Sequence, residues 1–79
     1  MWYTNRMKEF KIGKYRHFKG MEYEVLGLAT HSETGETLVI YRALYGERAV
    51  WARPLSMWEE RVERDGATYQ RFTYIGEEE

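Results

Sequence analysis

Turn-forming glycines recur at short intervals between Ile12 and Pro54, and this spacing restricts the fold more than any other feature of the chain. Gly20, Gly35 and Gly46 each separate segments rich in β-branched and aromatic residues. Intervals this short leave little room for helices of the usual ~11–12 residues. The stretch therefore predicts four β-strands joined by tight turns. With the C-terminal strands added, we expect at least five antiparallel strands and no helix longer than about two turns.

The first predicted hairpin pairs Tyr15–Phe18 with Tyr23–Leu26, with Lys19-Gly20 in the turn. An even-length loop places four residues on one face: Phe18, Arg16, Tyr23 and Val25. The other face then carries Tyr15, His17, Glu22 and Glu24. In this register His17 faces a carboxylate across the ladder. A loop of odd length would exchange these partners, because a shift of one residue moves every side chain to the opposite face.

The second predicted hairpin turns at Ser32-Glu33-Thr34-Gly35. A type I turn followed by Gly35 in the left-handed region gives a bulged three-residue loop. That register pairs Leu28 with Ile40 and lays Tyr41 over Gly27. The apolar alternation slips at Gly27, which indicates a bulge or bend there. Together the first two hairpins and the later helical turn give an expected core: Phe18, Tyr23, Val25, Leu28, Leu38, Ile40 and Met57.

The remaining turns follow from local signals. Tyr45-Gly46-Glu47-Arg48 closes a third hairpin, with Trp51 beside Tyr41, Arg42 or Ala43; the sequence leaves this register open. Pro54 ends the fourth strand because it lacks a backbone N–H. Ser56 and Glu59 have the spacing of a capping box, which predicts one helical turn carrying Met57 and Trp58. Asp65-Gly66 predicts a two-residue hairpin between Val62–Arg64 and Tyr69–Tyr74.

These elements predict a mainly β fold: a small SH3-like antiparallel barrel of five to six strands with a short 3-10 or helical turn before a late strand. The 79 residues are expected to form one domain at 13–75, with an N-terminal arm at 1–12 and an acidic tail at 76–79. An OB-like barrel is disfavoured because no longer helix is predicted. Trp2 and Tyr3 would either dock on the domain or form a dimer contact, which is compatible with a monomer or a weak homodimer.

Composition narrows the classes of function. The chain has no Cys, so disulfides and thiolate metal sites are excluded. No apolar run reaches the ~18 residues of a membrane span, and no signal peptide is recognisable, so we expect a cytoplasmic protein without membrane contact. The net charge is −1, although residues 1–19 hold six Lys or Arg against one Glu. This segment could be a basic edge for an anionic partner, but docking against the acidic remainder is favoured, because nucleic-acid-binding domains usually show net basicity.

Three blocks of the sequence resemble a known family. They are, in order, Tyr15-x-His17-Phe18-Lys19-Gly20-x-x-Tyr23-x-Val25, Tyr41-Arg42-x-Leu44-Tyr45-Gly46 and Trp51-x-Arg53-Pro54-Leu55-x-Met57. The chain resembles, over about Gly13 to Glu63, the small bacterial family catalogued as domain of unknown function 1653. Trp58 stands where that family is expected to have Phe. The resemblance implies a compact, mostly β, prokaryotic domain and assigns no catalytic or ligand-binding residue.

His17 is the first candidate for chemistry, since histidine transfers protons near neutral pH. Oriented by Glu22 or Glu24, it would supply two members of a hydrolytic site, but no spacing specifies a nucleophile. A His–Glu pair that only sets strand register is the favoured interpretation. His17 and His31 are the only histidines, and no metal-binding motif or glycine-rich phosphate loop is present, so we predict neither a metal nor a cofactor.

Aromatic and arginine residues point instead to binding. We predict ligand contacts from His17, Tyr41, Tyr45 and Arg53, because aromatic surfaces with arginine bind extended peptides and also stack unpaired bases. Trp51 is expected in the core, whereas Tyr41 and Tyr45 could be core or surface. The leading hypothesis is a non-catalytic module that binds a peptide or protein partner. Single-stranded nucleic-acid (RNA) binding and a small hydrolase using His17 are the alternatives.

Overall fold

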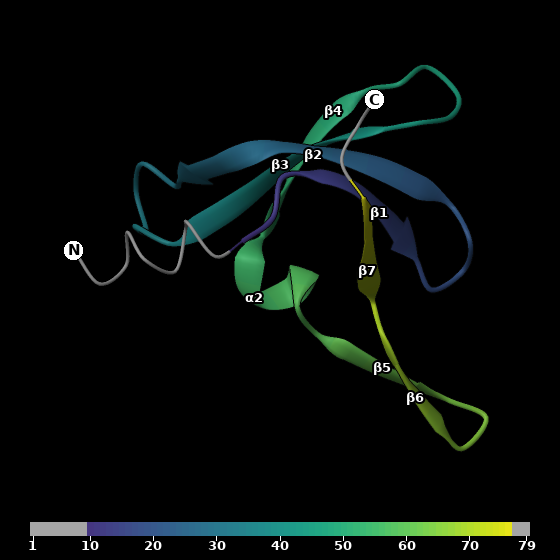
Figure 1. Ribbon diagram of the computed structural model, residues 1–79. Helices are drawn as coiled ribbons and strands as arrows, with labels where there is room; N and C mark the ends of the chain where they lie inside the picture. The colour runs from purple at the N-terminus through teal and green to yellow at the C-terminus, as the bar shows by residue number, and fades with distance from the viewer. Residues whose placement is uncertain (1–9, 77–79) are drawn as a thin grey trace.

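The computed structural model describes residues 10–76, which form seven strands and one short helix (Figure 1). The strands are β1 (Gly13–His17), β2 (Glu22–Thr30), β3 (Thr37–Ala43), β4 (Val50–Pro54), β5 (Arg61–Arg64), β6 (Ala67–Gln70) and β7 (Phe72–Gly76). The helix, α2 (Leu55–Trp58), follows β4 directly. The expectation of a mainly β chain with at least five antiparallel strands and no long helix is confirmed. Within residues 10–76 no helix could span a membrane.

The strands form two sheets rather than a closed barrel. Five strands pair in the order β4-β3-β2-β1-β7, and β5 pairs only with β6. The predicted barrel of five to six strands is therefore wrong, because within residues 10–76 β4 and β7 are the two edges of an open sheet. The β5–β6 hairpin extends away from this sheet (Figure 1). Trp2 and Tyr3, most of the predicted arm and the tail beyond Gly76 lie outside the described residues.

The first hairpin has an odd loop, so its predicted register is wrong. Tyr15 pairs with Tyr23 and Arg16 with Glu22, which leaves Phe18-Lys19-Gly20 as a three-residue loop. The Gly20 N–H donates to the His17 carbonyl at 2.7 Å, and Gly20 has φ of 109°. The Nδ1 atom of the His17 ring accepts a hydrogen bond from the Lys19 N–H (3.1 Å). This bond stabilises the three-residue loop rather than the even-length loop that was predicted. His17 and Tyr15 therefore share a face with Tyr23, and Glu22 lies on the opposite face.

The second hairpin is also displaced by one residue. Gly35 has the predicted left-handed backbone (φ 79°), but the loop holds four residues because His31 and Glu36 close it, with the His31 N–H donating to Glu36 O at 2.8 Å. Leu28 therefore pairs with Val39 instead of Ile40. The predicted irregularity near Gly27 is confirmed as a register shift between Val25 and Gly27, but Tyr41 lies opposite Val25 and not over the glycine.

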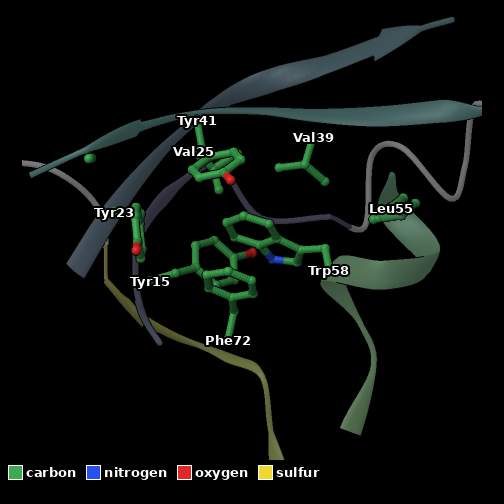
Figure 2. Close-up of a cluster of buried hydrophobic side chains, with 9 residues drawn as sticks. Tyr15, Tyr23, Val25, Val39, Tyr41, Leu55, Trp58 and Phe72 are labelled. Carbon is green, nitrogen blue, oxygen red and sulfur yellow. The ribbon is translucent and has the colours of Figure 1, made fainter. Parts of the chain in front are cut away.

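One face of the five-stranded sheet forms the core; we call it the inner face. Its buried cluster, shown in Figure 2, comprises Tyr15, Tyr23, Val25, Val39, Tyr41, Ala43, Leu55, Trp58 and Phe72. Trp58 of α2 stacks on Phe72 with ring centroids 3.7 Å apart and is 2% exposed. Tyr23 and Val25 are the predicted core residues found here. Phe18, Leu28, Leu38 and Ile40 are half-buried, and Met57 is exposed.

The local signals of the C-terminal half give mixed results. Pro54 ends β4, and Asp65-Gly66 forms the predicted two-residue turn, with φ of 53° and 81°. The helical turn is confirmed, but the capping box is wrong. Ser56 lies inside α2, Pro54 is the N-cap, and no side chain caps the helix. Burial of Leu55 and Trp58 against the sheet stabilises this turn, because so short a helix has little stability of its own.

Candidate binding site

The four residues predicted to contact a ligand surround two inner-face rings, Tyr23 on β2 and Phe72 on β7. His17, at the end of β1, has its ring centroid 5.0 Å from that of Phe72 and 6.5 Å from that of Tyr23. Tyr41 and Tyr45 each lie 5.5 Å from Tyr23, in edge-to-face contact. The Arg53 guanidinium carbon lies 5.8 Å from the Phe72 centroid. The fold thus brings the four predicted residues into one cluster, through strand pairings that the sequence-based register did not contain.

The four residues differ in what they can offer a ligand. Tyr41 is 4% exposed and belongs to the core, so it supports the cluster from beneath. Tyr45, in the loop after β3, is 42% exposed, while His17 and Arg53 are half-buried. Direct contact is therefore available to Tyr45, His17 and Arg53. Figure 2 shows Tyr23 at the side of the core away from Leu55, which begins α2.

The His17 imidazole is neutral and is surrounded by positive charge. Burial lowers the pKa of His17 below its usual value, and the charges of Arg71, Lys19 and Arg53 lower this pKa further. Because Nδ1 accepts the Lys19 N–H, the proton of the neutral ring resides on Nε2. His17 therefore presents a donor, and the predicted carboxylate across the ladder is absent because Glu22 and Glu24 point to the other face of the sheet.

Two arginines bring unused hydrogen-bond donors to this cluster. The Nε atoms of Arg53 and Arg71 are buried and find no acceptor among the described residues. Arg71 uses one Nη2 contact, to Glu60 Oε1 at 3.1 Å. Its backbone is held on both sides, with its N–H donating to Glu60 O and its carbonyl accepting the Phe18 N–H. A guanidinium fork held in this way suits a carboxylate or phosphate.

Sequence reasoning missed Arg71. The residue lies in the short connection between β6 and β7, and no motif surrounds it. Only the pairing of β7 with β1 brings it near His17, which pairs with Phe72. The alternation of the last two strands could not reveal this, since it does not specify which strand β7 joins.

The Tyr23 and Tyr45 hydroxyl oxygens lie 2.8 Å apart, so one donates to the other. Burial raises the pKa of Tyr23, and the hydrogen bond to Tyr45 raises it further. The Tyr23 phenol is therefore neutral at physiological pH. The pair fixes the exposed Tyr45 ring above the buried Tyr23 ring, so that the loop after β3 contributes an ordered aromatic surface.

Trp51 extends this surface along β4. It pairs with Tyr41, their ring centroids are 6.3 Å apart, and Trp51 is 52% exposed. The expectation that Trp51 belongs to the core is wrong, because Trp58 takes that place. A large ring that is half-exposed beside Arg53 is typical of binding surfaces, where tryptophan and arginine are enriched.

The arrangement is poor in groups for acid–base or metal chemistry. The carboxylates that could orient His17 form ion pairs on the opposite face, Glu22 with Arg16 at 2.9 Å and Glu24 with Arg42 at 3.8 Å. Within residues 10–76 no three acidic or histidine side chains gather to hold a metal ion. A hollow of ≈ 590 Å³ lies nearby and shares Phe72 with the cluster; its other walls include Phe10, Tyr15, Trp58 and Tyr74.

Fold and cluster together define a small antiparallel β domain whose inner face combines an aromatic core with a donor-rich patch. The chain belongs to the DUF1653 family of proteins of unknown function, whose model matches residues 13–74. It is similar to the crystal structure of a DUF1653 protein from Bordetella bronchiseptica, at 39% identity and with a TM-score of 0.82, covering 92% of this chain and 96% of that one. The comparison with curated proteins gives no match. The resemblance seen in the sequence is confirmed.

Proposed function

We propose that this protein is a non-catalytic binding module whose inner-face patch takes an anionic group of a peptide or protein partner. The patch comprises His17, Tyr45, Arg53 and Arg71 around the Tyr23 and Phe72 rings. The observation that carries the proposal is that the charges acting on His17 are all positive, while the Arg53 Nε–H has no acceptor among the described residues. Arg71 already pairs with Glu60, whereas Arg53 has no acidic partner among the described residues, and a carboxylate of the bound molecule would supply one.

The aromatic rings supply the second part of the proposed interaction. Tyr45 and Trp51 present flat, half-exposed surfaces held by contacts to Tyr23 and Tyr41. Rigid aromatic side chains lose little conformational entropy when they bind, so they contribute contact area at low cost. A partner segment with an acidic group next to an apolar one fits both features.

A titration of capped peptides tests the proposal. Acidic peptides should bind the protein, and the same peptides with Glu replaced by Gln should bind roughly tenfold more weakly or worse, as the loss of a charge-assisted hydrogen bond predicts. Arg53→Gln should cause a similar loss. Arg42→Gln is the matched control, since Arg42 lies on the neighbouring strand β3 but pairs with Glu24 on the other face. Equal affinities for Glu and Gln peptides would overturn the proposal.

The titration should also depend on pH. A bound carboxylate would raise the pKa of His17 from its depressed value, so binding would be coupled to proton uptake. Affinity should therefore increase as the pH falls from about 7.5 toward 5.5, while peptide carboxylates with pKa near ~4.3 remain largely ionised. His17→Asn should remove most of this dependence.

Single-stranded RNA is the second candidate, because Tyr45 and Trp51 are exposed beside Arg53 and could stack bases. The net charge of −1 speaks against it. An oligouridine titration at several salt concentrations separates the two. RNA binding predicts a slope of about 0.7 in log affinity per phosphate contacted, whereas a peptide with one acidic contact should show a weaker dependence.

A further inference from the structure

Strand β4 is an edge of the five-stranded sheet: β3 pairs with it on one side, and no strand of residues 10–76 pairs with it on the other. An unpaired edge presents a row of free backbone N–H and C=O groups that can pair with another chain. β4 lies at one margin of the sheet in Figure 1, and it is the strand that carries Arg53 and Trp51. The donor-rich patch and a free strand edge therefore adjoin.

The pairing of β4 with β3 identifies which backbone groups are free. The Ala43 N–H donates to the Ala49 carbonyl at 3.1 Å, just before the strand begins. Hydrogen-bonded and non-hydrogen-bonded pairs alternate along an antiparallel ladder. Trp51, opposite Tyr41, and Arg53, opposite Val39, therefore bond to β3. The N–H and C=O groups of Val50 and Ala52 are directed to the free edge.

Pro54 agrees with this assignment. It pairs with Leu38 and follows the parity of Val50 and Ala52, so its missing N–H lies on the free side and costs β3 no hydrogen bond. The usable edge thus ends at Ala52, beside the Arg53 side chain. A strand added here would place alternate side chains on the inner face, at the level of Trp51 and Arg53.

The other edge, β7, is less suited to accept a strand. Its pairing with β1 contains a register shift between Lys14 and Tyr15, whereas the pairing of β4 with β3 runs without a shift over five residue pairs. Irregular pairing twists an edge away from a straight partner. β4 also exposes apolar side chains, with Val50 47% and Trp51 52% exposed. Of these two edge strands, only β4 combines regular pairing, exposed apolar side chains and the adjacent Arg53.

We propose that the partner is an extended acidic peptide segment that adds to β4 as a sixth strand. Its main chain pairs with Val50 and Ala52, one acidic side chain pairs with Arg53, and a neighbouring apolar side chain packs on Trp51. This inference rests on the proposed function, and it specifies the conformation of the partner. Backbone pairing favours a peptide over a nucleic acid, because only a peptide supplies the matching amide groups.

Amide hydrogen exchange tests the pairing directly. The probe is a heptapeptide of alternating Val and Glu with acetyl and amide caps, so that only side-chain carboxylates are present. Its addition should slow exchange of the Val50 and Ala52 amides at least about tenfold, as protection by a new hydrogen bond predicts. The Trp51 and Arg53 amides, already bonded to β3, serve as internal controls. Binding without added protection at Val50 and Ala52 would overturn strand addition.

Two changes separate strand addition from the proposed anion site. Methylating the peptide amides that would face β4 should weaken binding roughly tenfold or more, since it removes backbone donors and keeps every carboxylate. Ala52→Pro should do the same from the side of the protein, because an outward N–H on an edge strand can be lost without breaking the sheet. Circular dichroism and the Tm of that variant show whether it folds, and the methylated peptide tests the proposal if it does not.

The outcomes distinguish the two proposals. Acidic peptides that bind with unchanged affinity after methylation overturn strand addition and leave the anion site in place. Failure of every acidic peptide overturns both. Oligouridine that binds and protects no β4 amide would identify a nucleic-acid partner and overturn strand addition. Self-association seen by sedimentation and lost in Ala52→Pro would mean that a second copy of the chain occupies the β4 edge. That result would also overturn the proposal of an added peptide strand.

Discussion

The two faces of the five-stranded sheet show how differently similar residues can be used. The inner face buries three tyrosines, Tyr15, Tyr23 and Tyr41, against Trp58 and Phe72. The outer face carries ion pairs and leaves aliphatic residues such as Leu38 and Ile40 half-exposed. In this small domain aromatic rings build the core, since each buries ~150–250 Å² and few are needed. On β3 the sequence-based register assigned Leu38 and Ile40 to the core, whereas the structure buries Val39 and Tyr41 there.

The largest loss of stability is expected when an aromatic ring is removed from the core on the inner face. Trp58→Ala should destabilise the protein by about 3–5 kcal/mol, because it deletes a buried indole stacked on Phe72. Trp51→Ala is the matched change, and it should cost less than about 1 kcal/mol because half of that ring is already in water. Urea denaturation of both variants measures the difference. Equal losses would mean that Trp51 has a core role.

Two neighbours on β3 test which face is the core. Val39 is fully buried, so Val39→Ala should cost roughly 1.5–2.5 kcal/mol, from about 0.8 kcal/mol per buried methylene plus a cavity. Ile40 is half-buried on the outer face, and Ile40→Ala should cost less although it removes more atoms. Thermal melts of the two variants decide this. A larger loss for Ile40→Ala would restore the register expected from the sequence.

A pH titration sharpens the description of the inner face. The pKa of His17 is lower in the folded protein than in the unfolded chain, so folding disfavours the protonated ring. The stabilisation is complete above about pH 6.5, the unfolded value, and declines as the pH falls from there through the folded pKa. His17→Asn keeps an acceptor for the Lys19 N–H and removes the titration. The stability difference between the two proteins should change across this window; a constant difference would contradict the shift.

The smallest effect is expected on the outer face. Arg16 donates to Glu22 from both Nε and Nη2, but its side chain is 54% exposed. Exposed ion pairs typically contribute only ~0.2–1 kcal/mol, and many contribute nothing measurable. A double-mutant cycle of Arg16→Ala and Glu22→Ala should therefore give a coupling energy within that range, reduced further by salt. A coupling above about 2 kcal/mol would show that the outer face is shielded from water.

Loop length explains why the sequence located the turns but misassigned the faces. Gly20, Gly35 and Asp65-Gly66 all lie in turns with positive φ, as their chemistry requires. In the first two hairpins a histidine ring accepts backbone N–H groups inside the turn, His17 from Lys19 and His31 from Glu33 and Thr34. Each of these two loops differs by one residue in length from the loop that was expected. A shift of one residue in the pairing moves every side chain of a strand to the opposite face of the sheet. Asp65-Gly66 has no such alternative, and its predicted loop is confirmed.

The sequence predicted only those parts of the candidate site that depend on local features of the chain. His17, Tyr45 and Arg53 stand at strand ends or in a loop, where polar and aromatic groups have no local role, and the sequence shows this. Arg71 and the exposure of Trp51 could not be predicted, because both depend on long-range events. β7 pairs with β1, and Trp58 occupies the core position that Trp51 would otherwise fill.

The sequence by itself determined the family, the β class, the turn positions and the end of β4 at Pro54, because these depend on local backbone preferences or on short runs of residues. Only the tertiary structure decided which tryptophan is buried, which face holds the core and which charges surround His17. Those outcomes depend on strand register and strand order, which arise from packing between segments distant in the chain. A shift of one residue costs little locally yet exchanges the two faces of a strand.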